Sequence, residues 1–341
     1  MKDNSFARHL TAFFTEYLAC ERGFSPNTIR SYSNTFMLLL SYLDDIQHIK
    51  ADRIKMSHLT RKTIVTFLDW LQEDKNNKDT TRNQRLAAIH AFSRYMQYED
   101  VTHIEQWQQI LSIKIKKTVR HSVNYLSLDG IKLLLLQIPQ DTQAGRRDLA
   151  MMALLYDSGA RVQELVDLTP LDLHLTMPYY VTLFGKGRKK RLVPIQKAQA
   201  DILNHYLVEN RLDRPSASHQ PLFQNNRGGK LTGAGVKFIL SRYAAEARIV
   251  NPELIPERIS PHSFRHSKAM HLLQAGVNLV YIRDILGHVS IQTTEIYARA
   301  DSKQKRAALE AAYSDVLPPI DEKASWERDS ELKFWLKGLG K

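Results

Sequence analysis

Ser-Pro-His-Ser-Phe-Arg occupies residues 260–265, and this short stretch predicts the start of a helix with two functional side chains on one face. Ser260 is a favourable N-cap residue, and Pro261 suits the first helical turn. His262 and Arg265 are three positions apart, so their side chains lie on the same face of that helix. The helix N-terminus adds free backbone N–H groups and a positive dipole end. A phosphate bound there would therefore meet donors from three sources.

A second informative stretch follows this helix. Residues 286–288 read Leu-Gly-His, which is typical of a helix that ends at a glycine, and residues 293–297 read Thr-Thr-Glu-Ile-Tyr. We therefore expect His288 and Tyr297 to lie on different elements although they are close in the sequence. Taken singly, these two residues and His262 would be interpreted as structural, since the chain has 14 tyrosines and 13 histidines.

A third stretch precedes the helix start. Residues 158–165 read Ser-Gly-Ala-Arg-Val-Gln-Glu-Leu. Gly159 is expected to end one helix, and Arg161 to lie just before the next, which carries Glu164. Alone this pattern is weak, because Arg161 could simply pair with a nearby carboxylate.

A short hairpin is predicted between these stretches. Residues 179–184 and 190–195 are rich in β-forming side chains and flank the sequence Gly-Lys-Gly-Arg at 185–188. This pattern predicts two antiparallel strands joined by a glycine-permitted turn, with Lys186 at the tip and Arg188 beside it. The spacing is not that of a nucleotide-binding P-loop, so that class of site is excluded.

The first hundred residues have apolar side chains at helical spacing. Ser25 and Pro26 predict the start of a helix. Its inward-facing residues are expected to be Ile29, Tyr32, Phe36, Leu39 and Leu43. Further helices are predicted over about residues 61–72 and from Thr81 onward, so this part of the chain is expected to form a small helical bundle.

Several cationic residues fall outside the expected cores. Arg82 and Arg85 are predicted on the face of their helix opposite its apolar stripe, where they are either merely solvated or in contact with phosphates. The helical pattern then breaks between Ile110 and His121, where small and β-branched residues alternate with Lys114, Lys116, Lys117 and Arg120. This segment is expected to be an extended linker, and it could also lie against a DNA backbone.

Composition favours a polyanionic partner. The chain has 341 residues and a formal net charge of +12, which creates a positive field around the molecule. Cys20 is the one cysteine, which excludes an internal disulfide framework and a Cys-rich zinc site and fits a reducing cytoplasm. Residues 1–18 lack the apolar core of a signal peptide, and no stretch is apolar for the ~20 residues of a membrane helix. We therefore expect a cytoplasmic protein with no membrane partner.

Together the motifs resemble the signature of the tyrosine recombinase family, also called the phage integrase or Xer-like family. Residues 158–165 resemble its first motif box and residues 262–297 its second. The hairpin, with Arg-Leu-Val-Pro at 191–194, resembles its catalytic-lysine hairpin, and the helical bundle, including Ser-Pro-Asn-Thr at 25–28, resembles its core-binding domain. The resemblance extends roughly over residues 6–313.

The resemblance implies a mainly α-helical chain in four parts. Residues 1–110 would form the helical core-binding domain that clamps DNA, and residues 111–125 a basic linker. Residues 126–315 would form a mostly helical catalytic domain with a small antiparallel hairpin or sheet. The tail, residues 316–341, is longer than the usual short end, and it could dock on a neighbouring protomer or pack on its own domain.

The resemblance also implies an enzyme that cuts and rejoins DNA without a cofactor or metal ion. Tyr297 would attack phosphorus and form a 3′-phosphotyrosyl intermediate with a free 5′-hydroxyl. Arg161, Arg265 and His288 would neutralise the phosphate oxygens, because a guanidinium stays cationic and can bind two oxygens at once. We expect His262 to be the general base and Lys186 the general acid. Candidate DNA contacts are Arg82, Arg85, Lys114, Lys116, Lys117 and Arg188.

Double-stranded DNA is the implied partner, with a homo-oligomer assembled on it as a dimer per site and a tetramer in the synapse. The unusual tail slightly favours a mobile element over chromosome-dimer resolution or phage integration. Three alternatives stay open: a topoisomerase with nearly the same site, a DNA-binding regulator with the same fold, and a metal hydrolase. The hydrolase would use His262 and His266 with His271 or His288, but it lacks a suitably placed carboxylate ligand.

Overall fold

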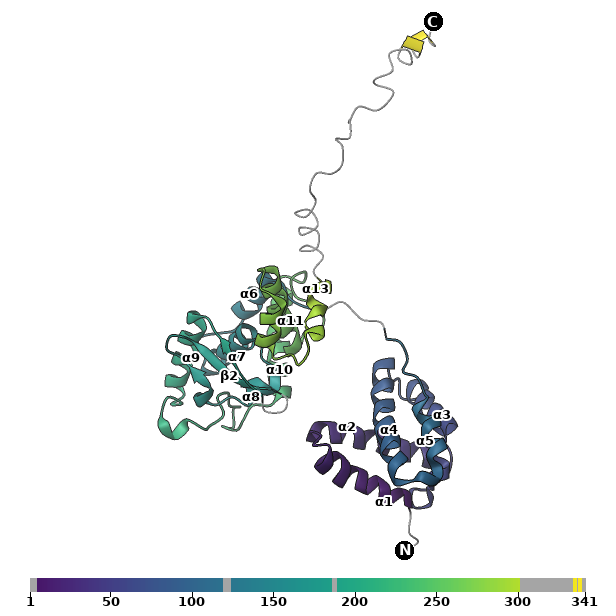
Figure 1. The fold of residues 1–341 in the computed structure, drawn as a ribbon. Coiled ribbons are helices and arrows are strands. Elements are labelled where there is room, and N and C mark those ends of the chain that lie inside the picture. Colours follow the sequence, from purple (N-terminus) through teal and green to yellow (C-terminus); the bar gives the residue numbers. More distant parts are fainter. Residues whose placement is uncertain (1–4, 119–123, 186–188, 301–333, 336, 339–341) are drawn as a thin grey trace. The chain divides into compact units, whose positions relative to one another are not determined.

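The structure, a computed structural model, describes residues 5–118, 124–185, 189–300, 334, 335, 337 and 338. Contacts divide the chain into two compact units, Met1–His121 and Ser122–Lys341 (Figure 1). The described residues are mainly helical, with one small antiparallel sheet, which confirms the expected fold class. Among them, none of the helices has both the length and the apolar composition needed to cross a membrane.

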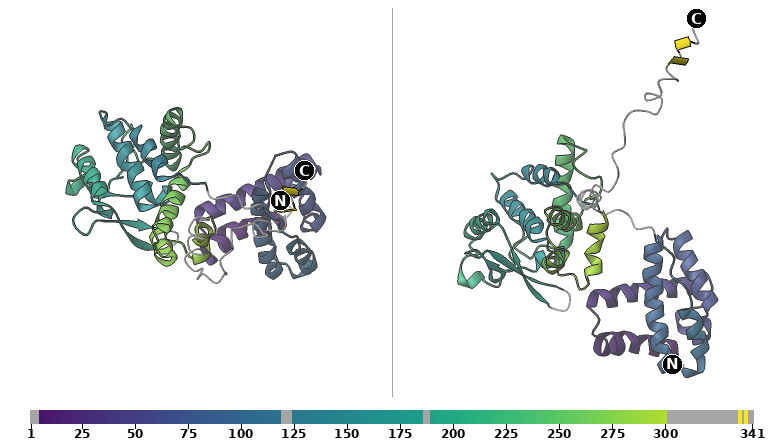
Figure 2. Two further views of the ribbon diagram at one scale, coloured as in Figure 1. Left: turned by 90° about the horizontal axis from the view of Figure 1, so that it is seen from above. Right: turned by 45° about the horizontal axis from the view of Figure 1, so that its top comes forward.

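The N-terminal unit is a bundle of helices around an aromatic core. Its elements are α1 (Ser5–Ala12), a π-helical segment (Phe13–Glu21), α2 (Pro26–Asp45), α3 (Arg61–Glu73), α4 (Asp79–Glu99) and α5 (Ile104–Leu111), with short 3-10 turns at Ala51–Arg53, Met56–His58 and Val101–His103. Helices α1 and α2 run side by side and cross the group formed by α3, α4 and α5 at a steep angle (Figures 1 and 2). Ser25 caps α2 as predicted, because its side chain accepts a hydrogen bond from the backbone N–H of Thr28 at 3.3 Å. Phe92 lies near the centre, with its ring centroid 5.2 Å from that of Phe13 and 6.0 Å from that of Trp107.

Arg82 is buried, contrary to the exposed position predicted for it. Its exposed fraction is 5%, and within the described part of the chain its Nε and Nη1 atoms have no hydrogen-bond partner. Arg85 donates from Nη1 to the Ser31 carbonyl and to Thr35 Oγ1, both at 3.2 Å. The reason is that α4 contacts helices on several sides, namely α1, α2, α3 and α5, so the surface flanking its apolar stripe is largely covered.

The segment after α5 is held to the N-terminal unit by its backbone. Asn83 donates to the Lys116 carbonyl at 2.8 Å and accepts from the Lys116 N–H at 3.0 Å. Lys116 Nζ also donates to Gln72 at 2.7 Å. The side chains of Lys114, Lys116 and Lys117 are exposed. This extended segment therefore presents three cations while it is fixed against α3 and α4.

Within the described part of residues 124–300, the C-terminal unit contains eight α-helices and one sheet. The helices are α6 (Leu128–Leu136), α7 (Gln143–Ser158), α8 (Val162–Val166), α9 (Lys197–Glu209), α10 (Gly233–Val250), α11 (Pro261–Gln274), α12 (Leu279–Leu286) and α13 (Glu295–Ala300), with 3-10 turns at Pro215–Ala217 and Ile291–Thr293. A further 3-10 turn, Pro170–Asp172, leads into the sheet. The main apolar core joins α6, α7, α9, α10 and the sheet, and a smaller cluster joins α11, α12 and α13.

The predicted hairpin is confirmed and gains a third strand. Strands β2 (Tyr180–Phe184) and β3 (Lys190–Pro194) pair antiparallel, with Val181 opposite Val193. Strand β1 (Leu173–His174) pairs with β2 and is too short to leave a periodic pattern in the sequence. The sheet order is β1-β2-β3.

Two helices of this unit end at glycines, as predicted. Gly159 ends α7 with a φ of 58°, and Gly287 ends α12 with a φ of 63°. Left-handed backbone of this kind favours glycine, because a side chain would be strained there. Helix α11 begins at Pro261, also as predicted, and the Ser260 N–H donates to Ser263 Oγ at 3.1 Å.

Candidate active site

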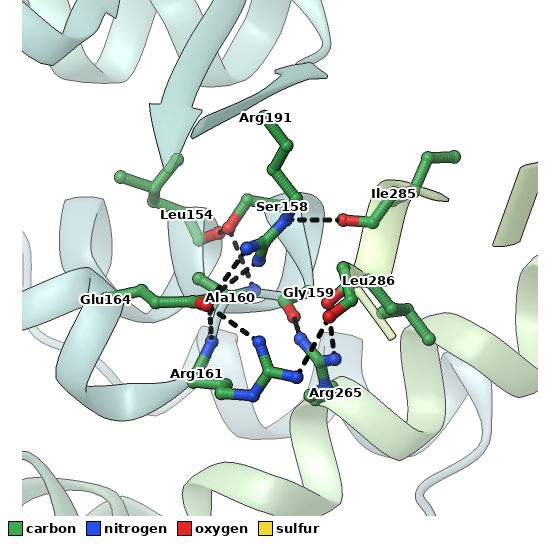
Figure 3. A network of polar contacts seen from close by, with 11 residues as sticks. Leu154, Ser158, Gly159, Ala160, Arg161, Glu164, Arg191, Arg265, Ile285 and Leu286 are labelled. Carbon is green, nitrogen blue, oxygen red and sulfur yellow. Dashed lines mark hydrogen bonds and ion pairs between the residues drawn. The ribbon is translucent and has the colours of Figure 1, made fainter. Parts of the chain in front are cut away.

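Arg265 lies at the centre of a polar cluster where three helices meet. It comes from the first turns of α11, and only 4% of the residue is exposed. Its Nη1 donates to the Gly159 carbonyl at 2.7 Å, and its Nη2 donates to the Leu286 carbonyl at 2.5 Å (Figure 3). These carbonyls belong to the C-terminal ends of α7 and α12, where the helix dipoles favour a cation. Burial and the neighbouring Arg161 lower the pKa of Arg265 to about 10, so it stays cationic at neutral pH.

Arg161 lies beside Arg265 and is more accessible. It precedes α8, and 34% of its side chain is exposed. Its Nη1 donates to Glu164 Oε1 at 2.8 Å, and its Nη2 donates to the Gly287 carbonyl at 3.1 Å. Two guanidinium groups from separate parts of the sequence are thus fixed side by side, one buried and one open to a ligand (Figure 3).

Glu164 is shared by two arginines. Arg191 from β3 donates to both carboxylate oxygens of Glu164, at 2.9 and 2.7 Å, and donates to the Ile285 carbonyl at 2.9 Å. Burial opposes ionisation of Glu164, but hydrogen bonds from Arg191 and Arg161 outweigh it and hold its pKa below the ordinary value. The carboxylate is therefore ionised and orients both guanidinium groups.

Tyr297 is buried against two histidines. Its exposed fraction is 1%, and its phenolic oxygen lies 2.9 Å from His266 Nδ1. Its ring stacks on that of His288, with centroids 6.4 Å apart and planes at 14°. Burial raises the pKa of Tyr297 although Arg265 and Arg161 lower it in part, so the phenol is protonated at neutral pH.

The histidines of the cluster are neutral at neutral pH. Burial, followed by the charges of His262 and Arg265, lowers the pKa of His266 to about 4. Burial, followed by Arg265 and Arg161, lowers the pKa of His288 to about 4. A neutral His266 with its proton on Nε2 can accept at Nδ1, and in that tautomer the phenol of Tyr297 donates to it. His288 Nδ1 lies 2.9 Å from Thr294 Oγ1, which orients its ring.

The structure brings together five of the six side chains predicted for the site. Arg161, Arg265, His288 and Tyr297 belong to the cluster described above, and His262 lies at its exposed edge. The ring of His262 is 6.0 Å from that of His266, and desolvation followed by Arg265 lowers its pKa. Among the described residues, the phenol of Tyr297 forms its hydrogen bond with His266 and not with His262.

Lys186 and Arg188 lie outside the described residues, so their positions stay predictions. The root of their hairpin is described, and the Gly185 N–H donates to the Lys189 carbonyl at 2.9 Å. A Cβ atom built on Gly185 would lie 3.6 Å from Glu164 Oε1. The hairpin therefore leaves the sheet next to the carboxylate that orients Arg161.

Two residues of this cluster were missed as members of the site. His266 follows Arg265 directly and was considered only as a metal ligand, although its position one helical turn after His262 is a usable signal. Arg191 was noted only as part of the Arg-Leu-Val-Pro run, and nothing in its local sequence indicates that it reaches Glu164. Within the described ranges, no group of three or more His, Cys, Asp or Glu side chains is placed to hold a metal ion.

Comparisons with known proteins agree with this arrangement. The model of the phage integrase family matches residues 124–304, and that of the phage integrase N-terminal SAM-like domain matches residues 12–100. A putative integrase/recombinase, y4rC, from Sinorhizobium fredii is 36% identical and covers 99% of both chains. The tyrosine recombinase XerD of Listeria monocytogenes is 35% identical over 83% of this chain and 91% of its own.

Solved structures share the fold. The XerH site-specific recombinase bound to a difH substrate aligns with a TM-score of 0.65 at 21% identity, over 85% of this chain and 81% of its own. The integrase of the Tn1549 transposon, in complex with transposon end DNA, aligns with a TM-score of 0.67 at 17% identity, over 89% and 98% of the two chains.

Proposed function

The chain belongs to the tyrosine recombinase family of site-specific, DNA strand-transferring enzymes, and on that premise we propose that Tyr297 is its nucleophile. The observation that carries the proposal is the hydrogen bond of 2.9 Å between the Tyr297 phenol and His266, beside two guanidinium groups. A phosphodiester in this cluster would meet Arg161 and Arg265 as donors to its nonbridging oxygens. His288 adds a neutral donor, and the loss of one such preorganised donor typically costs ~10² to 10³ in rate.

We assign the proton of the nucleophile to His266 rather than to His262. As the Tyr297 oxygen bonds to phosphorus and the bond from phosphorus to the 5′ oxygen breaks, the phenolic proton passes to His266 Nδ1. The bound phosphate adds negative charge to the cluster, which raises the pKa of the imidazole and favours its protonated form. His262, exposed at the N-terminus of α11, serves as a further donor to the phosphate.

Lys186 is the proposed general acid. The departing 5′ oxygen is a far stronger base than a phenolate and needs a proton, which an ammonium at the hairpin tip would supply. The product is a 3′-phosphotyrosyl link and a free 5′-hydroxyl. Attack by an incoming 5′-hydroxyl reverses each transfer and rejoins the strand.

Double-stranded DNA is the proposed partner, clamped by both units of the chain. The exposed Lys114, Lys116 and Lys117 support backbone contacts by the segment that follows α5. Arg188 and Arg85 stay candidate DNA contacts. Arg82 is buried, so its side chain would have to move before it could contact a phosphate. Residues 1–110 would act as the core-binding domain, and residues 126–315 as the catalytic domain.

We propose that the enzyme acts in the cytoplasm, as a dimer on each DNA site and a tetramer in the synapse. We further propose that its biological role is the movement of a mobile element. The full-length similarity to a putative integrase/recombinase supports a role in integration as readily as in transposition. Residues 316–341 are proposed to contact a neighbouring protomer. No comparison favours a topoisomerase or a regulator.

The function is tested with a pool of nicked suicide duplexes that carry a randomised central segment. The enzyme should form adducts that survive denaturation, in the presence of a chelator, and sequencing of the captured DNA should converge on one site. Two copies of that site on a plasmid should then be converted into recombinant products. Relaxation of supercoils without recombinants would indicate a topoisomerase, and the absence of any adduct would overturn both readings.

A further inference from the structure

Arg191 ties three elements of the catalytic unit together, although it is not among the groups assigned to the reaction. From strand β3 it contacts both oxygens of Glu164 on α8 and the Ile285 carbonyl near the end of α12. Only 11% of its side chain is exposed, and 4% of that of Glu164. Figure 3 shows its guanidinium between the carboxylate and the end of α12. This position suits the planar fork of arginine, because three different nitrogens of Arg191 reach the three acceptors, whereas an ammonium would present all its N–H groups from one nitrogen.

Gly287 provides the space for this side chain. A Cβ atom built on Gly287 would lie 2.9 Å from Arg191 Nη1 and 3.1 Å from its Cδ and Cζ atoms. The carbonyl of the same glycine accepts from Arg161 Nη2 at 3.1 Å. Arg191 therefore packs against, or bonds to, both groups that hold Arg161, namely Glu164 and Gly287.

The charges explain why a second arginine is needed. Arg161 and Glu164 alone form a neutral pair, and such a pair has little attraction for a phosphate. Arg191 adds one positive charge, so the trio carries a net charge of +1 and the carboxylate is satisfied from its buried side. Arg161 can then direct its exposed edge to the phosphate.

We propose that Arg191 is a positioning residue that holds Arg161, through Glu164 and Gly287, in the orientation that binds the scissile phosphate, and that gives this trio its net positive charge. This inference rests on the proposed function. A misplacement of Arg161 by about 1 Å in an Arg191→Gln variant should lower the cleavage rate on the order of 10²-fold.

The test compares two duplexes that carry the site recovered from the randomised pool. One has an ordinary scissile phosphodiester, and the other has a methylphosphonate, in which a neutral methyl group replaces one nonbridging oxygen. Single-turnover adduct formation is measured with saturating protein. The methylphosphonate lacks the charge that Arg161 neutralises. On this substrate the Arg191→Gln and Arg161→Ala variants should therefore form the adduct at a rate much closer to that of the wild-type protein than on the phosphodiester. An equal loss on both substrates, or no loss on the phosphodiester, would overturn the inference.

A matched control is Lys190→Gln, which removes one positive charge from an exposed neighbour on the same strand. It should cleave both bound substrates at the wild-type rate. If Arg191→Gln does not fold, Arg191→Lys keeps the charge without the fork and should show a smaller defect with the same dependence on substrate. Absence of an adduct with the wild-type protein overturns the proposed function and this inference together, whereas normal cleavage by both Arg191 variants overturns this inference alone.

Discussion

Arg265 owes its fixed position to the ends of two helices. Its guanidinium is buried and donates hydrogen bonds to the carbonyls of Gly159 and Leu286, so a different side-chain conformation would break both bonds. Buried carbonyls without partners are costly, so these bonds also stabilise the meeting point of α7, α11 and α12. The same contacts that hold the fold therefore place a cation where the proposed phosphate binds.

Stability of the DNA-free protein should fall in mild acid. The pKa values of His266 and His288 are lowered from 6.5 to about 4 in the folded state, so the unfolded chain binds more protons between these values. The stabilisation from these neutral histidines is fully present above about pH 6.5 and is lost as the pH falls towards 4. We expect a lower Tm at pH 5 than at pH 7, measured by circular dichroism, and a smaller decrease for His266→Gln. An equal decrease in wild type and variant would contradict this explanation.

The two histidines of α11 should differ in their effect on cleavage. His266→Gln keeps an acceptor for the Tyr297 phenol but cannot take up its proton, so adduct formation should slow by ~10² to 10⁴-fold. His262→Gln removes a donor at the edge of the site and should have the smaller effect. Single-turnover rates of adduct formation on the recovered site test this. A larger decrease in rate for His262→Gln than for His266→Gln would mean that His262 is the general base, as the sequence predicted.

Glycine-ended helices are the elements on which the site is built. Their ends were predictable, because a glycine after an apolar helical run is a local signal. The start of α11 was predictable from another local signal, the pair Ser260 and Pro261. Contacts between elements were not predictable in this way. The bond from Arg191 to Glu164 and that from Tyr297 to His266 depend on how β3, α8, α11 and α13 pack, and no local pattern encodes that packing.

Gly159→Ala should destabilise the catalytic unit more than Gly276→Ala. Both glycines have positive φ, 58° and 83°, so both substitutions introduce backbone strain of roughly 1 kcal/mol. A Cβ on Gly159 would also lie 2.9 Å from Leu286 Cδ2, whereas a Cβ on Gly276 has nothing within 4 Å. Because Leu286 is fully buried, relief of that contact should cost about 1 kcal/mol more. Thermal unfolding of the two variants would give the comparison, and equal Tm values would refute it.

The chain as a whole divides into units with separate cores. The apolar cluster of the first unit runs from Phe6 to Ile113, and the clusters of the second begin at Leu126. The helical bundle and the hairpin followed from periodicity and turn residues, whereas the burial of Arg82 did not, because it reflects the number of helices that surround α4. Sequence patterns thus indicate which face of a helix is apolar but not how many neighbours cover the rest.

A fragment of residues 1–121 should fold alone. Its core is complete within the fragment, so it should give a helical circular dichroism spectrum and a single cooperative thermal transition. A fragment of residues 1–98 lacks α5 and its buried Trp107, and it should lose that cooperativity. A noncooperative transition in the longer fragment would mean that its stability depends on the catalytic unit.

The central claim is that the phenol of Tyr297 forms the covalent bond to DNA, and peptide mapping of the trapped adduct tests it most directly. Protease digestion and mass spectrometry should place all of the attached nucleotide on the peptide that contains Tyr297. A Tyr297→Phe variant should bind the same duplex and form no adduct. Nucleotide attached to another residue, or an adduct formed by Tyr297→Phe, would contradict the account.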